Sequence, residues 1–88
     1  MERKVLIVNM LGLHARAAAR LVTLASKFEA DVRVRKDSRE VSGKSIMGVM
    51  MLAAAKGTEL TLIAEGPDAA EALDELEALV ADRFGEEA

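Results

Sequence analysis

The residues best suited to chemistry stand together in one short stretch, Gly12-Leu13-His14-Ala15-Arg16. His14 is the only histidine, and it lies where an extended apolar run (residues 5–8) gives way to a helix-forming run (residues 15–28). The free N–H groups at a helix start, together with the helix dipole, favour an anion such as phosphate. An imidazole there can carry a phosphoryl group covalently, and Arg16 can reach the same anion. A histidine that serves only as a polar boundary residue is the competing interpretation.

Other kinds of site find little support in the residue types. A metal site needs three or four ligands, and His14 has no second histidine, no cysteine and no carboxylate near it in the sequence. None of the four serines has the surroundings of an activated nucleophile, and no glycine-rich loop matches a nucleotide-binding motif. We therefore expect no metal, no cofactor and no self-sufficient enzyme. Phosphoryl carriage needs less, because donor and acceptor proteins can supply the activation.

Size and composition restrict the class of protein. The 88 residues are enough for one domain spanning residues 1–88, and 51% hydrophobic with 31% charged residues is typical of a globular chain. The absence of cysteine fits a reducing compartment, and no apolar run reaches the roughly 18 residues of a membrane span. We expect a cytoplasmic location and no membrane partner. A net charge of −3 and two phenylalanines as the only aromatic residues argue against a nucleic-acid partner.

The pattern along the chain predicts four strands and three helices. Strands are predicted at residues 4–9, 30–35, 39–42 and 58–64, and helices at residues 15–28, 46–55 and 69–84. A hairpin in the middle of this order excludes a purely parallel sheet. The order β-α-β-β-α-β-α predicts an α+β fold, an open-faced two-layer sandwich with a four-stranded antiparallel sheet and three helices on one face. Asp68 and Glu71 are predicted to cap the last helix, and residues 85–88 to fray.

Two surfaces could bind partners. The basic stripe, comprising Arg16, Arg20, Thr23 and Lys27, runs down one side of the first predicted helix and is either a solvated face or a docking surface for an acidic partner. The second predicted helix has Ser45 as its N-cap and Gly57 as its C-cap, and it is apolar nearly all round. We expect Val49, Leu52 and Ala53 to pack on the sheet and Ile46, Met47 and Met50 to be exposed for partners; methionines that fill an irregular core are the alternative.

The motif at His14 resembles the active-site motif of the HPr family, the histidine-containing phosphocarriers of the bacterial phosphoenolpyruvate-dependent phosphotransferase system. Residues 43–50, Gly-Lys-Ser-Ile-Met-Gly-Val-Met, resemble the regulatory serine segment of the same family, and the resemblance covers essentially the whole chain. It implies that His14 is phosphorylated on Nδ1 by enzyme I and passes the group to IIA proteins, with Arg16 assisting. It also implies that Ser45 is modified by HPr kinase/phosphorylase in bacteria that have it. Because phosphate at Ser45 would place charge and bulk on the Met-rich face but is favourable at a helix N-terminus, we predict weaker docking to enzyme I without unfolding of the chain. The partner-binding residues are then Arg20, Lys27, Ile46, Met47 and Met50, on a monomer.

One residue departs from the family pattern. The family usually has proline directly after the arginine, and this chain has Ala17. Alanine keeps the helix and adds a backbone donor, so the N–H groups of Arg16 and Ala17 are predicted to bind phosphate. The substitution fits a nitrogen-type regulatory branch better than the sugar-transport form. A regulatory module that acts mainly through phosphorylation-dependent protein binding is therefore the alternative function.

Overall fold

The computed structural model describes every residue from Met1 to Ala88. The strands are β1 (Glu2–Leu6), β2 (Asp31–Lys36), β3 (Arg39–Ser42) and β4 (Glu59–Glu65). The helices are α1 (Ala15–Ala25), α2 (Ile46–Met50) and α3 (Ala69–Ala81), followed by a short 3-10 helix, η1 (Arg83–Gly85). None of these helices is long and apolar enough to cross a membrane.

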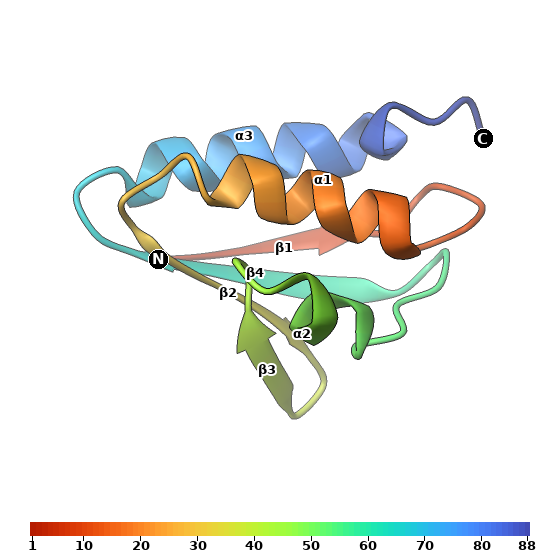
Figure 1. Cartoon of the computed structure of the whole chain (residues 1–88), viewed down its shortest axis with the longest axis horizontal. Helices are drawn as coiled ribbons and strands as arrows, with labels where there is room; N and C mark the ends of the chain where they lie inside the picture. Colours follow the sequence, from red (N-terminus) through yellow and green to blue (C-terminus); the bar gives the residue numbers. More distant parts are fainter.

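The four strands form one sheet in the order β1-β4-β2-β3, and every neighbouring pair is antiparallel. In Figure 1, α1 and α3 lie side by side above the sheet, and the short α2 lies in front of it beside α1. The predicted α+β fold, a two-layer sandwich with the helices on one face, is confirmed. This topology brings the loop between β1 and α1 close to the chain segment that follows α3 (Figure 1).

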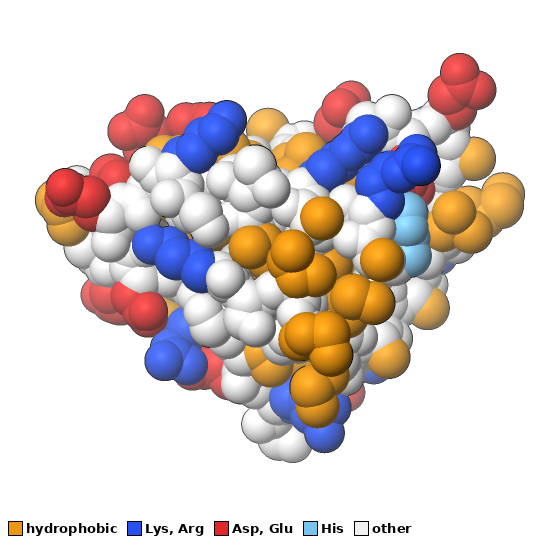
Figure 2. Space-filling model, viewed as in Figure 1, with side chains coloured by type: hydrophobic (Ala, Val, Ile, Leu, Met, Phe, Trp, Pro, Cys, Tyr) orange, Lys and Arg blue, Asp and Glu red, His pale blue; other side chains and the backbone are white.

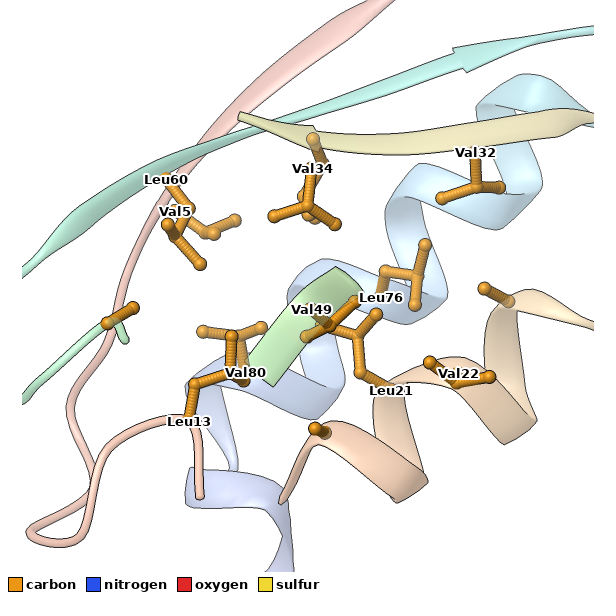
Figure 3. Close-up of a cluster of buried hydrophobic side chains, with 14 of the residues drawn as sticks. Val5, Leu13, Leu21, Val22, Val32, Val34, Val49, Leu60, Leu76 and Val80 are labelled. Carbon is orange, nitrogen blue, oxygen red and sulfur yellow. The ribbon is translucent and has the colours of Figure 1, made fainter. Parts of the chain in front are cut away.

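The core lies between the sheet and the helices. Alternation along the strands places Val34 opposite Leu62 and Val5 opposite Leu60, with all four side chains buried on the helical side. Figure 3 shows Val5, Val34 and Leu60 facing the helical side chains of the core. Burial of each such side chain stabilises the fold by roughly 1.5–3 kcal/mol. Because the strand residues are buried by contact with the helices, this packing holds α1 in position on the sheet.

Several predicted boundaries are wrong, each for a tertiary reason. β1 ends at Leu6 because the backbone of Ile7 bonds instead to Thr58 (2.9 Å) and Gly57 (2.7 Å). α2 ends at Met50, not at residue 55, because the chain turns there and Ala53 adopts a left-handed φ of 50°. That turn buries Leu52 and Ala54 and leaves Ala53 exposed, so the prediction that Ala53 packs on the sheet is wrong. Gly57 is not the helix cap, because α2 ends at Met50 and its C-cap is Met51.

The ends of the two long helices also differ from the prediction. α1 stops at Ala25, and the N–H groups of Lys27 and Phe28 then bond to the carbonyl oxygens three residues before them, as in a 3-10 turn. α3 stops at Ala81, after which Arg83, Phe84 and Gly85 all have positive φ values of 58°, 54° and 80°. The predicted fraying of residues 85–88 is wrong, because the N–H of Met10 donates to the carbonyl oxygen of Ala88 at 2.6 Å.

Asp68 does not cap α3 with its side chain, contrary to the prediction. Its carboxylate accepts hydrogen bonds from the backbone N–H groups of Glu29 (2.9 Å) and Ala30 (2.8 Å), at the turn between α1 and β2. The bond from Glu29, followed by that from Ala30, holds the pKa of Asp68 below its ordinary value of 3.8. The carboxylate therefore joins the start of α3 to the opposite connection.

An Asp68→Asn variant is expected to melt at a lower temperature than the wild type at neutral pH. Because the pKa of Asp68 is lowered in the folded state, its contribution to stability is present above the ordinary pKa of 3.8. It is lost as the pH falls through the lower folded-state value, so the gap in melting temperature should close in acid. Thermal unfolding across pH would measure the gap, with Asp37→Asn in the exposed β2–β3 turn as control. A gap that stays constant into acid would contradict this role.

Candidate functional site

His14 is placed by a loop whose backbone is held at several points. Gly12 has a φ of 66°, and a Cβ there would lie 2.5 Å from the carbonyl oxygen of Ala54, so only glycine fits. The next residue, Leu13, buries its side chain and donates its N–H to the same oxygen at 2.8 Å. Asn9 is fully buried, and its Nδ2 donates to the carbonyl oxygen of Gly12 at 2.8 Å. The loop therefore presents His14 in a fixed position.

α1 begins directly at this histidine. His14 is the N-cap residue, with φ −71° and ψ 177°, and its carbonyl oxygen accepts the first helical bond from Ala18 at 2.8 Å. The N–H groups of Ala15, Arg16 and Ala17, which come before that of Ala18 in the helix, have no hydrogen-bond partner. The His14 side chain does not cap the helix. The helix start therefore offers free donors and its positive dipole end beside the imidazole.

The structure brings Glu86 to this site, which the sequence did not predict. One carboxylate oxygen of Glu86 bonds to Nε2 of His14, and the other accepts from Nδ2 of Asn9 at 3.0 Å. The bond to His14, followed by that to Asn9, lowers the pKa of Glu86 below its ordinary value of 4.5. The side chains of His14 and Glu86 are 29% and 16% exposed, so the pair is half sheltered. Only one nitrogen of the ring is engaged.

A shallow hollow of about 630 Å³ surrounds the imidazole. It is lined by Met10, Leu11, His14, Ala15, Arg16, Glu86 and Ala88. Arg16 is exposed on its rim, and no ion pair of the structure uses its guanidinium. The site therefore combines a nucleophilic ring, an uncommitted cation and free backbone donors, a set that can hold a phosphoryl group.

The second predicted motif lies at the start of α2. Ser45 is the N-cap, as predicted, and its Oγ accepts from the N–H of Gly48 at 3.1 Å. Val49 is buried, whereas Ile46, Met47 and Met50 are exposed, Met47 by 70%. The alternative in which these methionines fill the core is wrong. Met51, which the sequence did not single out, is exposed as well.

Figure 2 shows the histidine and many hydrophobic side chains on one face of the molecule. The histidine lies between one hydrophobic group and a band of hydrophobic side chains that continues down towards α2. We define the apolar patch as Met10, Leu11, Ile46, Met47, Met50 and Met51, all of them exposed. Met10 and Leu11 line the hollow at His14, and the exposure of Ile46, Met47 and Met50 agrees with the prediction.

The residues of the basic stripe are exposed, Arg16, Arg20 and Thr23 on α1 and Lys27 in the turn that follows it. Arg16 and Lys27 form no ion pair, and Figure 2 shows basic side chains directly above the histidine. Arg20 differs from them, because its guanidinium donates to the carbonyl oxygen of Phe84. Arg20 therefore has a structural contact in addition to the partner-binding role predicted for it.

A comparison with protein families decides the classification. The family described as the PTS HPr component phosphorylation site matches residues 1–82 of this chain. The chain belongs to the HPr family. It is a family of phosphocarriers of the phosphotransferase system, so the resemblance inferred from the two motifs is confirmed.

Two curated relatives show the extent of the similarity. The chain is 54% identical to the phosphocarrier protein HPr of Cupriavidus necator over 86 residues, covering 98% of this chain and 97% of that protein. It is 44% identical to the phosphocarrier protein NPr of Shewanella violacea, also over 86 residues, covering 98% and 94% of the two chains. Phosphocarriers of both names are therefore similar to this chain.

Solved HPr structures share the fold. The crystal structure of HPr-C-His from Thermoanaerobacter tengcongensis has a TM-score of 0.96 and 45% identity, covering 100% of this chain and 99% of that one. An HPr dimer from the same organism has a TM-score of 0.79 and 48% identity, covering 85% and 86%. Dimers thus occur among the structural neighbours, and the expectation of a monomer does not follow from the family.

Proposed function

We propose that this HPr-family chain accepts a phosphoryl group on His14 from phosphoenolpyruvate-loaded enzyme I and passes it to IIA proteins. The observation that carries the proposal is the imidazole at the start of α1, beside the unpaired N–H groups of Ala15, Arg16 and Ala17. A phosphoryl group arriving there meets donors that need no rearrangement for its negatively charged oxygens. We also propose that the chain works in the cytoplasm and as a monomer, which keeps its docking surface free.

In the proposed transfer, a ring nitrogen of His14 attacks the phosphorus carried by the donor protein. The N–P bond forms while the bond from phosphorus to the donor breaks, and the electron pair of that bond returns to the donor. Arg16 and the free N–H groups neutralise the charge on the phosphoryl oxygens. Because the site is open on one side, an acceptor can reach the same phosphorus, and the reverse chemistry then unloads the carrier.

The direct test is incubation of the wild-type chain with enzyme I and phosphoenolpyruvate, followed by intact-mass measurement. We expect the mass of one phosphoryl group, lost again in mild acid because a phosphorus–nitrogen bond is acid-labile. An unlabelled chain, in a reaction where a known HPr becomes labelled, would contradict the proposal. Addition of a IIA protein should then remove the label from the loaded carrier.

We propose that the apolar patch is where enzyme I and IIA proteins dock. Its methionines are exposed, flexible and polarizable, and Met10 and Leu11 line the hollow at His14, so a partner that covers this end of the patch also covers the phosphoryl group. The basic stripe borders the patch and would attract acidic side chains of the same partners. Among the charged residues of the basic stripe, Arg20 and Lys27 lie farther along the chain from His14 than Arg16 does.

A Met47→Glu variant is expected to be phosphorylated by enzyme I at least about tenfold more slowly than the wild type, through a higher KM. A carboxylate in the centre of an apolar contact must be desolvated without a partner. The rate of labelling against carrier concentration would measure it. The control is Leu6→Glu, which makes the same change at an exposed leucine on the sheet face away from the helices. Equal KM values for Met47→Glu and wild type would exclude Met47 from the docking surface.

A regulatory role for Ser45 is the second proposal. Its hydroxyl caps α2 and lies next to Ile46 and Met47 of the apolar patch. A phosphate added by HPr kinase/phosphorylase would place charge and bulk beside that patch while remaining favourable at a helix N-terminus. Docking to enzyme I would weaken and the fold would remain. A nitrogen-type regulatory branch would use the same surface, and Ala17 in place of proline motivates that alternative.

A further inference from the structure

We propose that Glu86 sets the tautomer of His14, by holding the ring proton on Nε2 and leaving Nδ1 as the nucleophile. Glu86 is thus a positioning residue that acts through the histidine. Contacts within this chain support the assignment of the tautomer, and only its consequence for phosphoryl transfer rests on the proposed function.

The proton is assigned by a chain of hydrogen bonds that starts at the backbone. The carbonyl oxygen of Gly12 can only accept, so the Asn9 side chain must turn its NH₂ group towards it. The same NH₂ group donates to Oε1 of Glu86. Oε2 of Glu86 then faces Nε2 of His14, and an ionised carboxylate can only accept. Nε2 therefore carries the hydrogen, and the neutral ring has its lone pair on Nδ1.

The carboxylate is held in place by the segment around it. The ring of Phe84 is fully buried, and the carbonyl oxygen of Phe84 accepts from the guanidinium of Arg20. On the C-terminal side of Glu86, the carbonyl oxygen of Ala88 accepts a hydrogen bond from the N–H of Met10. Residues on both sides of Glu86 are thus fixed to α1 and to the histidine loop. Figure 1 shows this last segment of the chain next to the loop between β1 and α1.

The arrangement has two consequences for the transfer step. When the Nδ1 lone pair forms the bond to phosphorus, the proton stays on Nε2 and the ring becomes positively charged. Glu86, already bonded to Nε2, stabilises that charge, as a buried carboxylate does for the histidine of a hydrolytic triad. Glu86 also covers Nε2 and repels an anion there, so attack by that nitrogen is suppressed.

The test compares wild type with Glu86→Gln, a substitution that preserves size and removes the charge. Asn9 still offers its NH₂ group, so the carbonyl oxygen of Gln accepts from Asn9 and its NH₂ group faces Nε2 of His14. Nε2 must then accept, and the proton moves to Nδ1. Glu87→Gln is the matched control, because Glu87 is an exposed neighbour whose side chain makes no contact with the histidine.

Nitrogen NMR of histidine-labelled protein reports the tautomer directly, without any phosphoryl donor. We expect the Nε2–H form in wild type and Glu87→Gln, and a shift towards the Nδ1–H form in Glu86→Gln. Labelling of Glu86→Gln by enzyme I should also slow by about tenfold or more, because the nucleophilic nitrogen is protonated. Tautomer populations in Glu86→Gln that equal those of wild type would overturn the inference. That result would leave the proposed function intact, since the proposed function fails only if wild-type His14 takes up no phosphoryl group.

Discussion

Replacing His14 by alanine is expected to abolish the uptake of an acid-labile phosphoryl group while the chain remains folded. The side chain of His14 makes no capping bond to α1, and its one hydrogen-bond partner is Glu86. Glu86 keeps its bond from Asn9 and the free N–H groups of the helix start nearby, so removal of the ring leaves no buried charge unpaired. Intact mass after incubation with enzyme I and phosphoenolpyruvate measures the loss.

Arg16→Ala is the informative companion variant. It keeps the nucleophile and removes one charged donor, which is worth roughly 1.5–3 kcal/mol in a charge-assisted hydrogen bond. Labelling should therefore still reach completion but slow by about tenfold to a hundredfold. A label that survives in His14→Ala would show that another residue carries the phosphoryl group, and the site would have to be reassigned.

The parts of this structure that the sequence predicted depend on local patterns. Alternation in the strands and helical spacing in α1 and α3 were sufficient for the fold class, because each pattern reports which face of its own element is buried. His14 and Ser45 could be placed at helix starts for a similar reason. The roles proposed for them rest on a few consecutive residues, which include the glycine that the turn before His14 requires.

Glu86 could not be found in this way. It lies 72 residues from His14 in the sequence, in a segment whose composition is typical of a solvated tail. Its position depends on three consecutive left-handed residues after α3, including Phe84, a conformation that bulky residues rarely adopt. The one available signal was the aromatic Phe84 directly before Gly85, because a large apolar residue near a chain end has to be buried somewhere.

The length of α2 was predicted wrongly because the local pattern favoured a longer helix than the tertiary structure allows. Helical spacing continued through residue 55, and nothing in the local pattern argued for an earlier end. The helix ends at Met50 because Leu52 and Ala54 must both be buried and because the carbonyl oxygen of Ala54 is needed by the N–H of Leu13. A hydrogen bond between two loops, which no local pattern records, therefore decided the boundary.

Replacing Phe84 by alanine is expected to lower the free energy of unfolding by about 3–5 kcal/mol, because its ring is fully buried in the core. This is a large part of the roughly 5–15 kcal/mol that stabilises a small domain. The left-handed backbone of Phe84 costs roughly 1–2 kcal/mol, and burial of the ring offsets that cost. Urea unfolding would measure the change, with Phe84→Leu as a control that keeps most of the buried volume.

Phe84 also couples the stability of the fold to the proposed phosphoryl site at His14. Without the buried ring, nothing offsets the cost of the left-handed backbone in η1, so the segment that follows α3 should relax. Glu86 would then lose its contact with Nε2 of His14. Phe84→Ala should therefore change the histidine tautomer under conditions in which the rest of the chain remains folded, whereas Phe84→Leu should not. Unchanged stability in Phe84→Ala would mean that the ring contributes nothing to the core. Lower stability with an unchanged tautomer would instead separate the core from the contact between Glu86 and His14.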